Sequence, residues 1–362
     1  MGFDELNEEK SNFDILEQEV QSGIEGRNSG IPMGFNRLNK YVGIRKRIFT
    51  TVFGGTGTGK SALVHNAWIL QPFDYLQKHQ NSNLKMKVIL FSMERSKVYI
   101  LAKWISRKIF LDYGILIPIP KLLGWWDEKL TKDEHDLFLS TKDYLNELSE
   151  FCDIIEGAIN PTGIWKYVKK YAEANGKFEQ ISEYKKVYIP DHPNEIVVPI
   201  IDHYALATAE SGKTKKETVD KVSEYCQLMR DQLGYSPVGV SQINRDIGGM
   251  MLKKVDSFEP TLDHIKESGR MAEDGDVVIS LFQPSRYHTE DKAYTVSKFI
   301  DPNNGGDYFR RLTILKNSYG EADIGTGMAF FGAIGMFKEL HKAKDMENFD
   351  YNSLFNYSYF LD

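Results

Sequence analysis

The chain has 362 residues, with 45 Lys and Arg against 51 Asp and Glu and a formal net charge of −6. Hydrophobic residues make up 41% of it and aromatic residues 12%, an ordinary globular composition that excludes wholesale disorder, a collagen repeat and a disulfide scaffold. The acidic balance also excludes a protein coated in basic charge, so any contact with nucleic acid must use basic groups concentrated in a few places.

The first 30 residues are predicted to form a helix and a linker. Residues 3–22 are charged and carry apolar residues such as Phe13, Leu16 and Val20 at the spacing of a short amphipathic helix. Residues 22–30 are rich in Gly and Ser, which predicts a flexible connection. We expect the helix either to fray in solvent or to dock through its apolar stripe on a second copy of the chain.

The compartment is predicted from what the sequence lacks. The acidic start has no secretory signal, and no run of about 18 apolar residues is long enough to span a membrane. Cys152 and Cys226 lie far apart without a metal-type spacing, as expected of buried thiols in a reducing compartment. These features predict a soluble cytoplasmic protein without a membrane partner.

The body of the chain, residues 31–340, alternates between strand and helix patterns. Continuous apolar runs are typical of strands buried on both faces of a parallel sheet, and they occur at 48–53, 87–92, 196–201, 237–241, 276–281 and 310–316. Helical patterns lie between them at 61–70, 95–110 and 217–233. The alternation predicts an α/β domain with a mostly parallel central sheet flanked by helices.

Two stretches are predicted to be insertions that a minimal α/β domain does not need. Residues 171–195 are polar and are predicted to form an inserted hairpin or loop, and residues 284–308 contain a strong turn signal that predicts a second hairpin. The tail, residues 341–362, is acidic and aromatic, and we expect it to pack on the flank of the domain.

The strongest motif is a phosphate-binding loop between a predicted strand and a predicted helix. Its pattern is G-x-x-x-x-G-K-[ST], formed by Gly54, Gly55, Thr56, Gly57, Thr58, Gly59, Lys60 and Ser61. Glycines let backbone N–H groups turn toward phosphate oxygens, and the following helix N-terminus adds partial positive charge. Lys60 is expected to bind the β- and γ-phosphates of ATP and the Ser61 hydroxyl to bind Mg²⁺.

Three later strands end in residues suited to nucleotide hydrolysis. Glu94 follows the strand at 87–92 and can orient the attacking water, although it can also cap the following helix. Asp202 ends the apolar strand at 196–201, as expected of a carboxylate that holds Mg²⁺. Gln242 ends the strand at 237–241, where an amide can respond to the γ-phosphate.

The order of these motifs resembles the RecA-type motor domain of DnaB-family replicative helicases. The resemblance spans roughly residues 31–338. It rests on segments 31–38, 54–61, 91–94, 200–202, 241–245, 267–269, 274–278 and 315–320. The family's N-terminal primase-interacting domain has no counterpart in this sequence, which is typical of a compact form from a phage or mobile element.

The resemblance implies a ring, usually of six subunits, with ATP and Mg²⁺ bound between protomers and single-stranded DNA in the pore. Glu94 would activate water, Asp202 would hold the metal and Gln242 would couple the γ-phosphate to the DNA loops. Lys316 matches a lysine that acts on a neighbour's nucleotide. The family usually has an Arg two residues further on, where this chain has Ser318. Arg310 or Arg311 could replace it, hydrolysis could be slow, or a partner could supply the group.

Basic residues in two loops are candidates for DNA contact. They follow the Asp202 strand and the Gln242 strand, and are Lys213, Lys215, Lys216, Arg245, Lys253 and Lys254. Lysines and glycines in such loops suit backbone tracking without base readout, although the first group also fits a solvated surface loop.

The sequence therefore predicts an ATP-dependent replicative DNA helicase that binds single-stranded DNA as a hexameric ring, with a primase or a helicase loader as further partner. The first alternative is a nucleotide-dependent DNA-binding ring or accessory factor with weak or no unwinding. A RecA/RadA-type recombinase comes third, because segments 267–269 and 274–278 disfavour it. A small-molecule kinase is disfavoured by Gln242.

Overall fold

The computed structural model describes residues 11–82, 84–182, 185–242, 260–262 and 269–361. Residues 1–10 of the predicted N-terminal segment lie outside the described residues. So do three candidate DNA-binding residues, Arg245, Lys253 and Lys254, and two residues of the segment 267–269.

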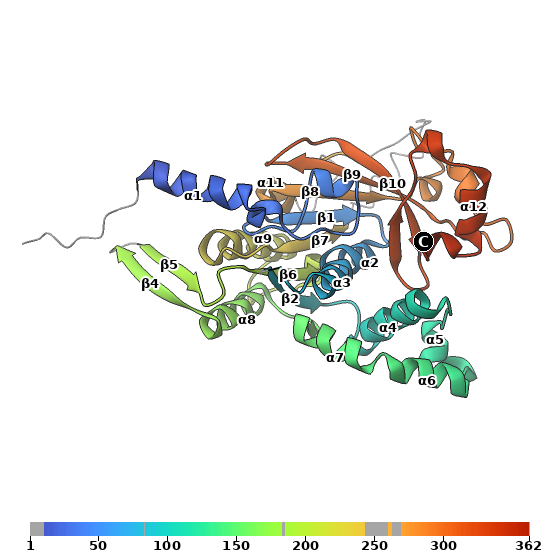
Figure 1. Ribbon diagram of the computed structural model, residues 1–362. Helices are drawn as coiled ribbons and strands as arrows, with labels where there is room; N and C mark the ends of the chain where they lie inside the picture. The colour runs from blue at the N-terminus through green and yellow to red at the C-terminus, as the bar shows by residue number, and fades with distance from the viewer. Residues whose placement is uncertain (1–10, 83, 183–184, 243–259, 263–268, 362) are drawn as a thin grey trace, which may run out of the picture.

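The described residues form a nine-stranded sheet in the order β11-β10-β9-β8-β1-β7-β6-β2-β3 (Figure 1). Six neighbouring strands are parallel, and β9, β10 and β11 extend the sheet antiparallel at one edge. The strands are β1 Thr50–Gly54, β2 Lys85–Ser92, β3 Cys152–Glu156, β6 Glu195–Asp202, β7 Val238–Gln242, β8 Val277–Phe282, β9 Phe309–Asn317, β10 Ile324–Phe331 and β11 Met336–Glu339. The predicted α/β class and all six predicted strands are confirmed, whereas β3, β10 and β11 were not predicted.

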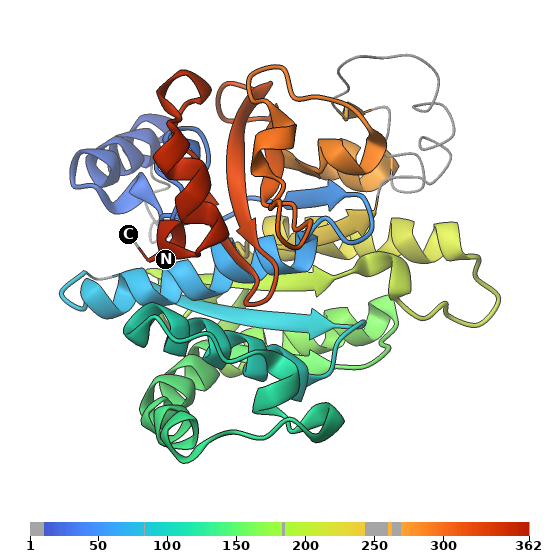
Figure 2. The ribbon, with the colours of Figure 1, turned by 90° about the vertical axis from the view of Figure 1, so that its right-hand side faces the viewer.

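Helices cover both faces of this sheet (Figure 2). Those on one face are α2 Lys60–His65, which continues through a π-helical turn at Asn66–Leu70, then α3 Gln71–Lys78, α4 Lys97–Tyr113 and α7 Lys142–Phe151. Those on the other face are α8 Pro161–Ala174, α9 Lys215–Leu233 and α11 Gly269–Asp274. The short α5 Ile119–Leu122 and α6 Lys132–Ser140 complete the segment between α4 and α7.

Burial on both faces explains the continuous apolar runs. In β2, Val88 and Leu90 pack into the cluster beneath α2 and α4, whereas Ile89 and Phe91 pack into the cluster beneath α8 and α9. Because successive side chains of a strand point to opposite faces, a strand covered on both sides needs an apolar residue at every position. The free thiols of Cys152 and Cys226 are both buried in these layers, as predicted.

Helix α1, Asn12–Ile24, extends away from the body on the same side as the hairpin of β4 Gly176–Ser182 and β5 Lys185–Pro190 (Figure 1). Ser11 begins α1 with a capping box, in which its side chain accepts from Asp14 N–H and Asp14 accepts from the Ser11 N–H. The hairpin confirms the insertion predicted at 171–195.

The second insertion differs from its prediction. Within residues 284–308 the chain forms 3₁₀ turns at Pro284–Tyr287 and Val296–Phe299, and its ends meet through a single bridge between Ile300 and Asp307. Tyr294 and Phe299 are buried against Phe309, so the segment is held by aromatic packing rather than by a strand ladder. The prediction of a hairpin there was wrong.

The C-terminal tail packs against the antiparallel edge, as expected. It forms α12 Asn348–Phe355 and a 3₁₀ turn at Ser358–Phe360. Leu354 and Phe360 are buried in a cluster with Phe331, and the ring of Tyr357 stacks on Phe331 at 4.3 Å between centroids. Across the residues that the structure describes, no helix is long and apolar enough to cross a membrane.

Candidate nucleotide site

The phosphate-binding loop joins β1 to α2 at the carboxyl edge of the parallel strands. Gly57 and Gly59 adopt φ values of +75° and +100°, a region that residues with a side chain rarely occupy. A Cβ on Gly59 would also lie 2.9 Å from Cζ of Phe330. Both glycines are therefore required for the loop to turn back toward the first turn of α2.

The loop borders a cavity of about 340 Å³ that gathers most of the predicted catalytic residues. They come from four elements or their ends, and those lining the cavity include Thr56, Gly57, Gly59, Lys60, Ser61, Glu94, Asp202 and Gln242. Gly54, Gly55 and Thr58 form the rest of the loop outside this lining. Strand pairing explains the convergence, because β1, β2, β6 and β7 lie in one parallel block whose carboxyl ends share an edge.

Lys60 is buried, and its ammonium group donates to the Gly55 carbonyl oxygen at 2.8 Å. Burial lowers the pKa of Lys60 to about 8, against the opposing charges of Asp202 and Glu94 and with added repulsion from Arg286. A buried ammonium in these surroundings is stabilised by a negatively charged ligand.

Asp202 and Ser61 form the candidate metal position. Their side chains are hydrogen-bonded, and burial raises the pKa of Asp202 to about 6. The Oδ1 atom of Asp202 and the Nε2 atom of His65 are buried without a hydrogen-bond partner among the described residues, and Nε2 lies 4.0 Å from Oδ2 of Asp202. Burial lowers the pKa of His65 to about 3, so this contact is not an ion pair at neutral pH.

This donor set fits Mg²⁺ bound together with a nucleotide. The described residues hold no cluster of three or more His, Cys, Asp or Glu side chains suited to a metal. Mg²⁺ in phosphate-binding sites commonly takes few protein ligands and completes its octahedron with phosphate oxygens and water. One carboxylate and one hydroxyl are therefore sufficient.

Glu94 and Gln242 reach the cavity from neighbouring strand ends. The Glu94 carboxylate is half-exposed at the cavity mouth, 3.6 Å from the guanidinium of Arg95. The Gln242 amide bridges Oγ1 of Thr56 at 3.4 Å and Nε2 of His203 at 3.3 Å. Glu94 is thus accessible to solvent water, and Gln242 connects the phosphate-binding loop to the residue after Asp202.

Three basic residues lie near the loop. Arg286 and Lys103 were not predicted as parts of the site, and Arg310 was predicted only as a replacement for the arginine missing at Ser318. Arg286 donates to the carbonyl of Thr56, and the buried Arg310 donates from Nε to the carbonyl of Thr58 at 2.9 Å. Lys103 of α4 lines the cavity, and burial lowers its pKa to about 8. No local motif marks these positions, because each depends on which strands and helices become neighbours.

The suggestion that Arg310 or Arg311 replaces the missing arginine at Ser318 is not supported. Arg310 is 4% exposed and lies behind its own phosphate-binding loop, over the ring of Phe330. Arg311 points to Asp291, with 3.8 Å between Nε and Oδ2. The Arg310 guanidinium is thus buried within its own chain, and the Arg311 side chain is 15% exposed. Lys316 lies away from its own cavity and donates to the carbonyl of Glu273 at 2.7 Å.

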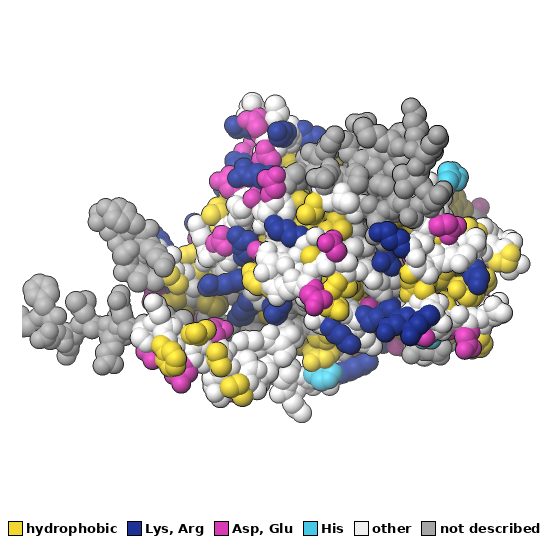
Figure 3. All heavy atoms as spheres, turned by 90° about the horizontal axis from the view of Figure 1, so that it is seen from above, with side chains coloured by type: hydrophobic (Ala, Val, Ile, Leu, Met, Phe, Trp, Pro, Cys, Tyr) yellow, Lys and Arg dark blue, Asp and Glu magenta, His cyan; other side chains and the backbone are white. Residues whose placement is uncertain are grey.

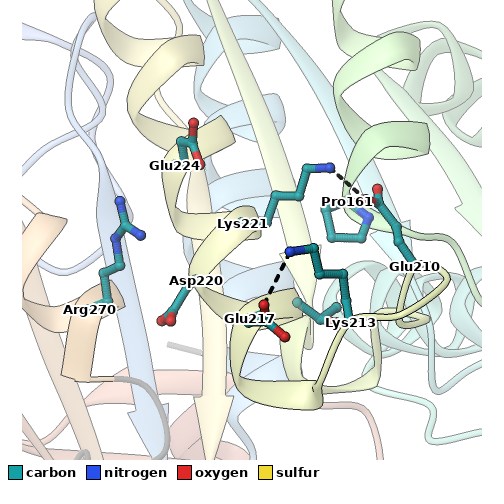
Figure 4. Close-up of a pocket in the computed structure, with 9 residues that line it drawn as sticks. Pro161, Glu210, Lys213, Glu217, Asp220, Lys221, Glu224 and Arg270 are labelled. Carbon is teal, nitrogen blue, oxygen red and sulfur yellow. Dashed lines mark hydrogen bonds and ion pairs between the residues drawn. The ribbon is translucent and has the colours of Figure 1, made fainter.

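The candidate DNA-binding lysines that the structure describes lie at the N-terminus of α9. Lys213, Lys215 and Lys216 are exposed. On the face shown in Figure 3, Lys and Arg side chains lie among Asp and Glu side chains. Figure 4 shows Lys213 turned toward Glu217 at the edge of a hollow of about 380 Å³, with Arg270 of α11 on its opposite side. Lys213 is therefore partly neutralised, whereas no ion pair is described for Lys215 or Lys216.

The parallel sheet covered on both faces, with a phosphate-binding loop after β1 and a buried carboxylate at the end of β6, defines a RecA-like P-loop ATPase fold. Residues 171–339 match the DnaB-like helicase C terminal domain. This match spans slightly less than half of the chain.

An individual protein is also similar to part of the chain. The replicative DNA helicase DnaB of Mycobacterium leprae (strain TN) is 28% identical over 135 residues, which cover 32% of this chain and 21% of that protein. The match thus spans about a fifth of the length of that relative.

Two solved structures share the fold. One is reported as a DnaB-like replicative helicase and its interactions with primase, with a TM-score of 0.65, 18% identity and coverage of 92% of this chain and 69% of the other. The other is reported as an ATPase domain, with a TM-score of 0.64, 18% identity and coverage of 91% of this chain and 99% of the other.

Proposed function

We propose that this protein is an ATP-dependent replicative DNA helicase that assembles as a ring, translocates on single-stranded DNA and unwinds duplex at a fork. One observation carries the proposal: Lys60, the Ser61–Asp202 pair, Glu94 and Gln242 converge on one cavity. Phosphate binding, metal binding, water activation and a link to the neighbouring strand end are therefore available at one place.

ATP would bind with its phosphates against the loop N–H groups and Lys60, whose ammonium would exchange the Gly55 carbonyl for phosphate oxygens. Ser61 and Asp202 would hold Mg²⁺, which when bound neutralises phosphate charge. The unpartnered Oδ1 atom of Asp202 supports this role, because a buried carboxylate oxygen is costly to leave without a partner.

Glu94 would position the water that attacks the γ-phosphate and accept its proton. Its half-exposed carboxylate at the cavity mouth supports that role over a purely structural one, because the cap of α4 is made by Ser96, which accepts from the N–H of Tyr99. Gln242 would report the state of the γ-phosphate to the residues that follow β7 in the sequence. We propose Arg245, Lys253 and Lys254 among them as DNA contacts, alongside Lys215 and Lys216.

Assembly of several copies would complete the nucleotide site and cover the exposed stripe on α1. Lys316 would act on the nucleotide of a neighbouring subunit after leaving the carbonyl of Glu273. The exposed stripe on α1, which includes Phe13, Leu16, Val20 and Ile24, would dock on another copy of the chain. A primase or helicase loader is a further proposed partner, on family grounds alone.

A second candidate function is a nucleotide-dependent DNA-binding ring with little unwinding. Ser318 favours it, because an arginine acting in trans contributes strongly to transition-state neutralisation in P-loop ATPases. The positions of Arg310 and Arg311 support this alternative, because both guanidiniums contact groups of their own chain.

The test is the rate of ATP hydrolysis with and without single-stranded DNA, measured for the wild-type chain and for Glu94→Gln. The proposal expects hydrolysis that DNA stimulates and that Glu94→Gln reduces by at least about 10²-fold without loss of ATP binding. Assembly and DNA binding without appreciable hydrolysis, and unaffected by Glu94→Gln, would instead support the second candidate.

A further inference from the structure

Two arginines that do not line the cavity contact the phosphate-binding loop. Arg286, from the 3₁₀ turn after β8, donates to the carbonyl of Thr56, and a Cβ on Gly57 would lie 2.7 Å from its Nη1 atom. Arg310, from β9, donates to the carbonyl of Thr58 at 2.9 Å. The two guanidiniums thus bind alternate carbonyl groups of one loop.

The pairing of strands brings both arginines there. β8 lies directly beside β1, with Leu281 opposite Gly54, so the turn that follows β8 emerges beside the loop. β9 lies beside β8, and Phe282 is opposite Arg311. Tyr287 belongs to the same turn, stacks on Phe282 and reaches the loop at Gly55.

Arg310 is held in place by contacts on several sides of its guanidinium. Its side chain is 5% exposed and also donates to the carbonyl of Phe309 at 2.6 Å, with Asp307 at 3.5 Å as counterion and the ring of Phe330 4.9 Å from the guanidinium carbon. Burial lowers the pKa of Arg310 to about 10, which leaves it charged at neutral pH. A buried guanidinium placed against a loop carbonyl, and not against the cavity, has no direct access to a bound nucleotide.

A peptide unit connects these carbonyls to the phosphate side of the loop. Because a trans peptide is planar, its C=O and N–H point in opposite directions. A cation bound to the carbonyl oxygen of Thr56 or Thr58 polarises the N–H of Gly57 or Gly59, and hydrogen bonds in series strengthen one another. The cations also fix the direction in which those N–H groups point.

We propose that Arg286 and Arg310 are positioning residues that clamp the carbonyl groups of Thr56 and Thr58, and so hold the N–H groups of Gly57 and Gly59 toward nucleotide phosphate. This inference rests on the proposed binding of ATP at the loop and adds a source of positive charge supplied within the subunit. The clamp serves the phosphates common to ATP and ADP, since it acts through the loop backbone.

Arg286→Gln is the main test, because Arg286 is exposed and its removal leaves the core intact. Arg286→Lys keeps a charged donor, and Lys298→Gln removes the same charge from an exposed position in the same segment. Each variant is titrated with Mg-ATP and Mg-ADP, and amide hydrogen exchange is followed in residues 54–61 with and without nucleotide. Arg310→Met is included with a thermal melt to check folding.

We expect Arg286→Gln to weaken both nucleotides about three- to ten-fold, the effect of one charge-assisted hydrogen bond discounted for exposure. Exchange in residues 54–61 should become faster even without nucleotide, Arg286→Lys should recover most of the loss, and Lys298→Gln should match the wild type. Unchanged affinity and unchanged exchange in Arg286→Gln overturn the clamp. A loss confined to ATP also overturns it, because that pattern marks a direct γ-phosphate contact. A wild-type chain that binds neither nucleotide contradicts the proposed function instead, and exchange in the free protein still decides the clamp.

Discussion

The Nε2 atom of Gln242 lies 3.3 Å from the Nε2 atom of His203, so the amide at the end of β7 is anchored to the residue that follows Asp202. The imidazole must accept this hydrogen bond, which requires it to be neutral, and burial lowers its pKa accordingly. Oε1 of Gln242 meanwhile accepts from Thr56. A change at the phosphate-binding loop can therefore move Gln242 relative to two strand ends.

Replacing His203 tests this link. His203→Phe keeps an aromatic ring but removes the acceptor, so we expect ATP binding to persist while stimulation of hydrolysis by single-stranded DNA falls several-fold. His203→Gln places an oxygen near the position of Nε2 and should restore much of the stimulation. The measurement is the ratio of stimulated to basal turnover, and an equal ratio in His203→Phe and wild type would show that the anchor is irrelevant to coupling.

The C-terminal tail contributes to stability through its buried aromatic residues. Phe360 is 2% exposed, whereas its neighbour Leu361 is 45% exposed. We expect Phe360→Ala to lower the free energy of unfolding by about 3 kcal/mol, through lost burial and the cavity it leaves. Leu361→Ala is the matched control and should change stability little. Equal denaturation midpoints for the two variants would mean that the tail does not belong to the folded core.

The N-terminus of α9 has a capping box whose strength depends on pH. The backbone N–H of Thr214, then its hydroxyl and Lys213, lower the pKa of Glu217 to about 2. A lowered pKa stabilises the folded state when the pH is above the ordinary pKa of Glu, about 4.3. This contribution disappears as the pH falls toward about 2. We therefore expect Glu217→Gln to be less stable than wild type at about pH 6, with a deficit that shrinks as the pH falls through that range. Glu224→Gln, exposed on the same helix, is the control. A deficit independent of pH would argue against the cap.

The apolar stripe of α1 is expected to carry assembly. Phe13 and Ile24 are 70% and 74% exposed, and Leu16 and Val20 lie between them on the same side of the helix. Changing Leu16 and Val20 to Ser should reduce the oligomer size in light scattering, because burial of this stripe against another copy would be lost. Gln18→Ser alters the opposite side and should leave assembly intact. An unchanged oligomer in the double variant would contradict docking through α1.

The sheet was predictable because its pattern is local. Strands such as β2 and β6 are covered on both faces, so they contain the continuous apolar runs 88–91 and 196–201, which stand out in the sequence. β10 was missed, since Gly325 and Gly327 interrupt its apolar pattern. They meet large side chains at close range, Arg311 and Tyr294, which no local signal indicates.

The candidate nucleotide site was likewise predictable only in part. Lys60, Glu94, Asp202 and Gln242 were predictable because each ends or follows a strand at a fixed point of a motif. Arg286 was not, because its place beside the loop depends on β8 pairing with β1 across more than two hundred residues of sequence. Arg310 was noticed for its charge, but its direction is set by burial against Phe330 and Thr58.

The most direct test of the account is strand separation on a forked duplex with a single-stranded tail, followed with ATP and Mg²⁺ for the wild-type chain and for Glu94→Gln. The account predicts that the wild type separates the strands at a rate that follows ATP concentration, whereas Glu94→Gln binds the fork and ATP but leaves the duplex intact. A wild-type chain that binds the fork, assembles and hydrolyses ATP without separating the strands would contradict it.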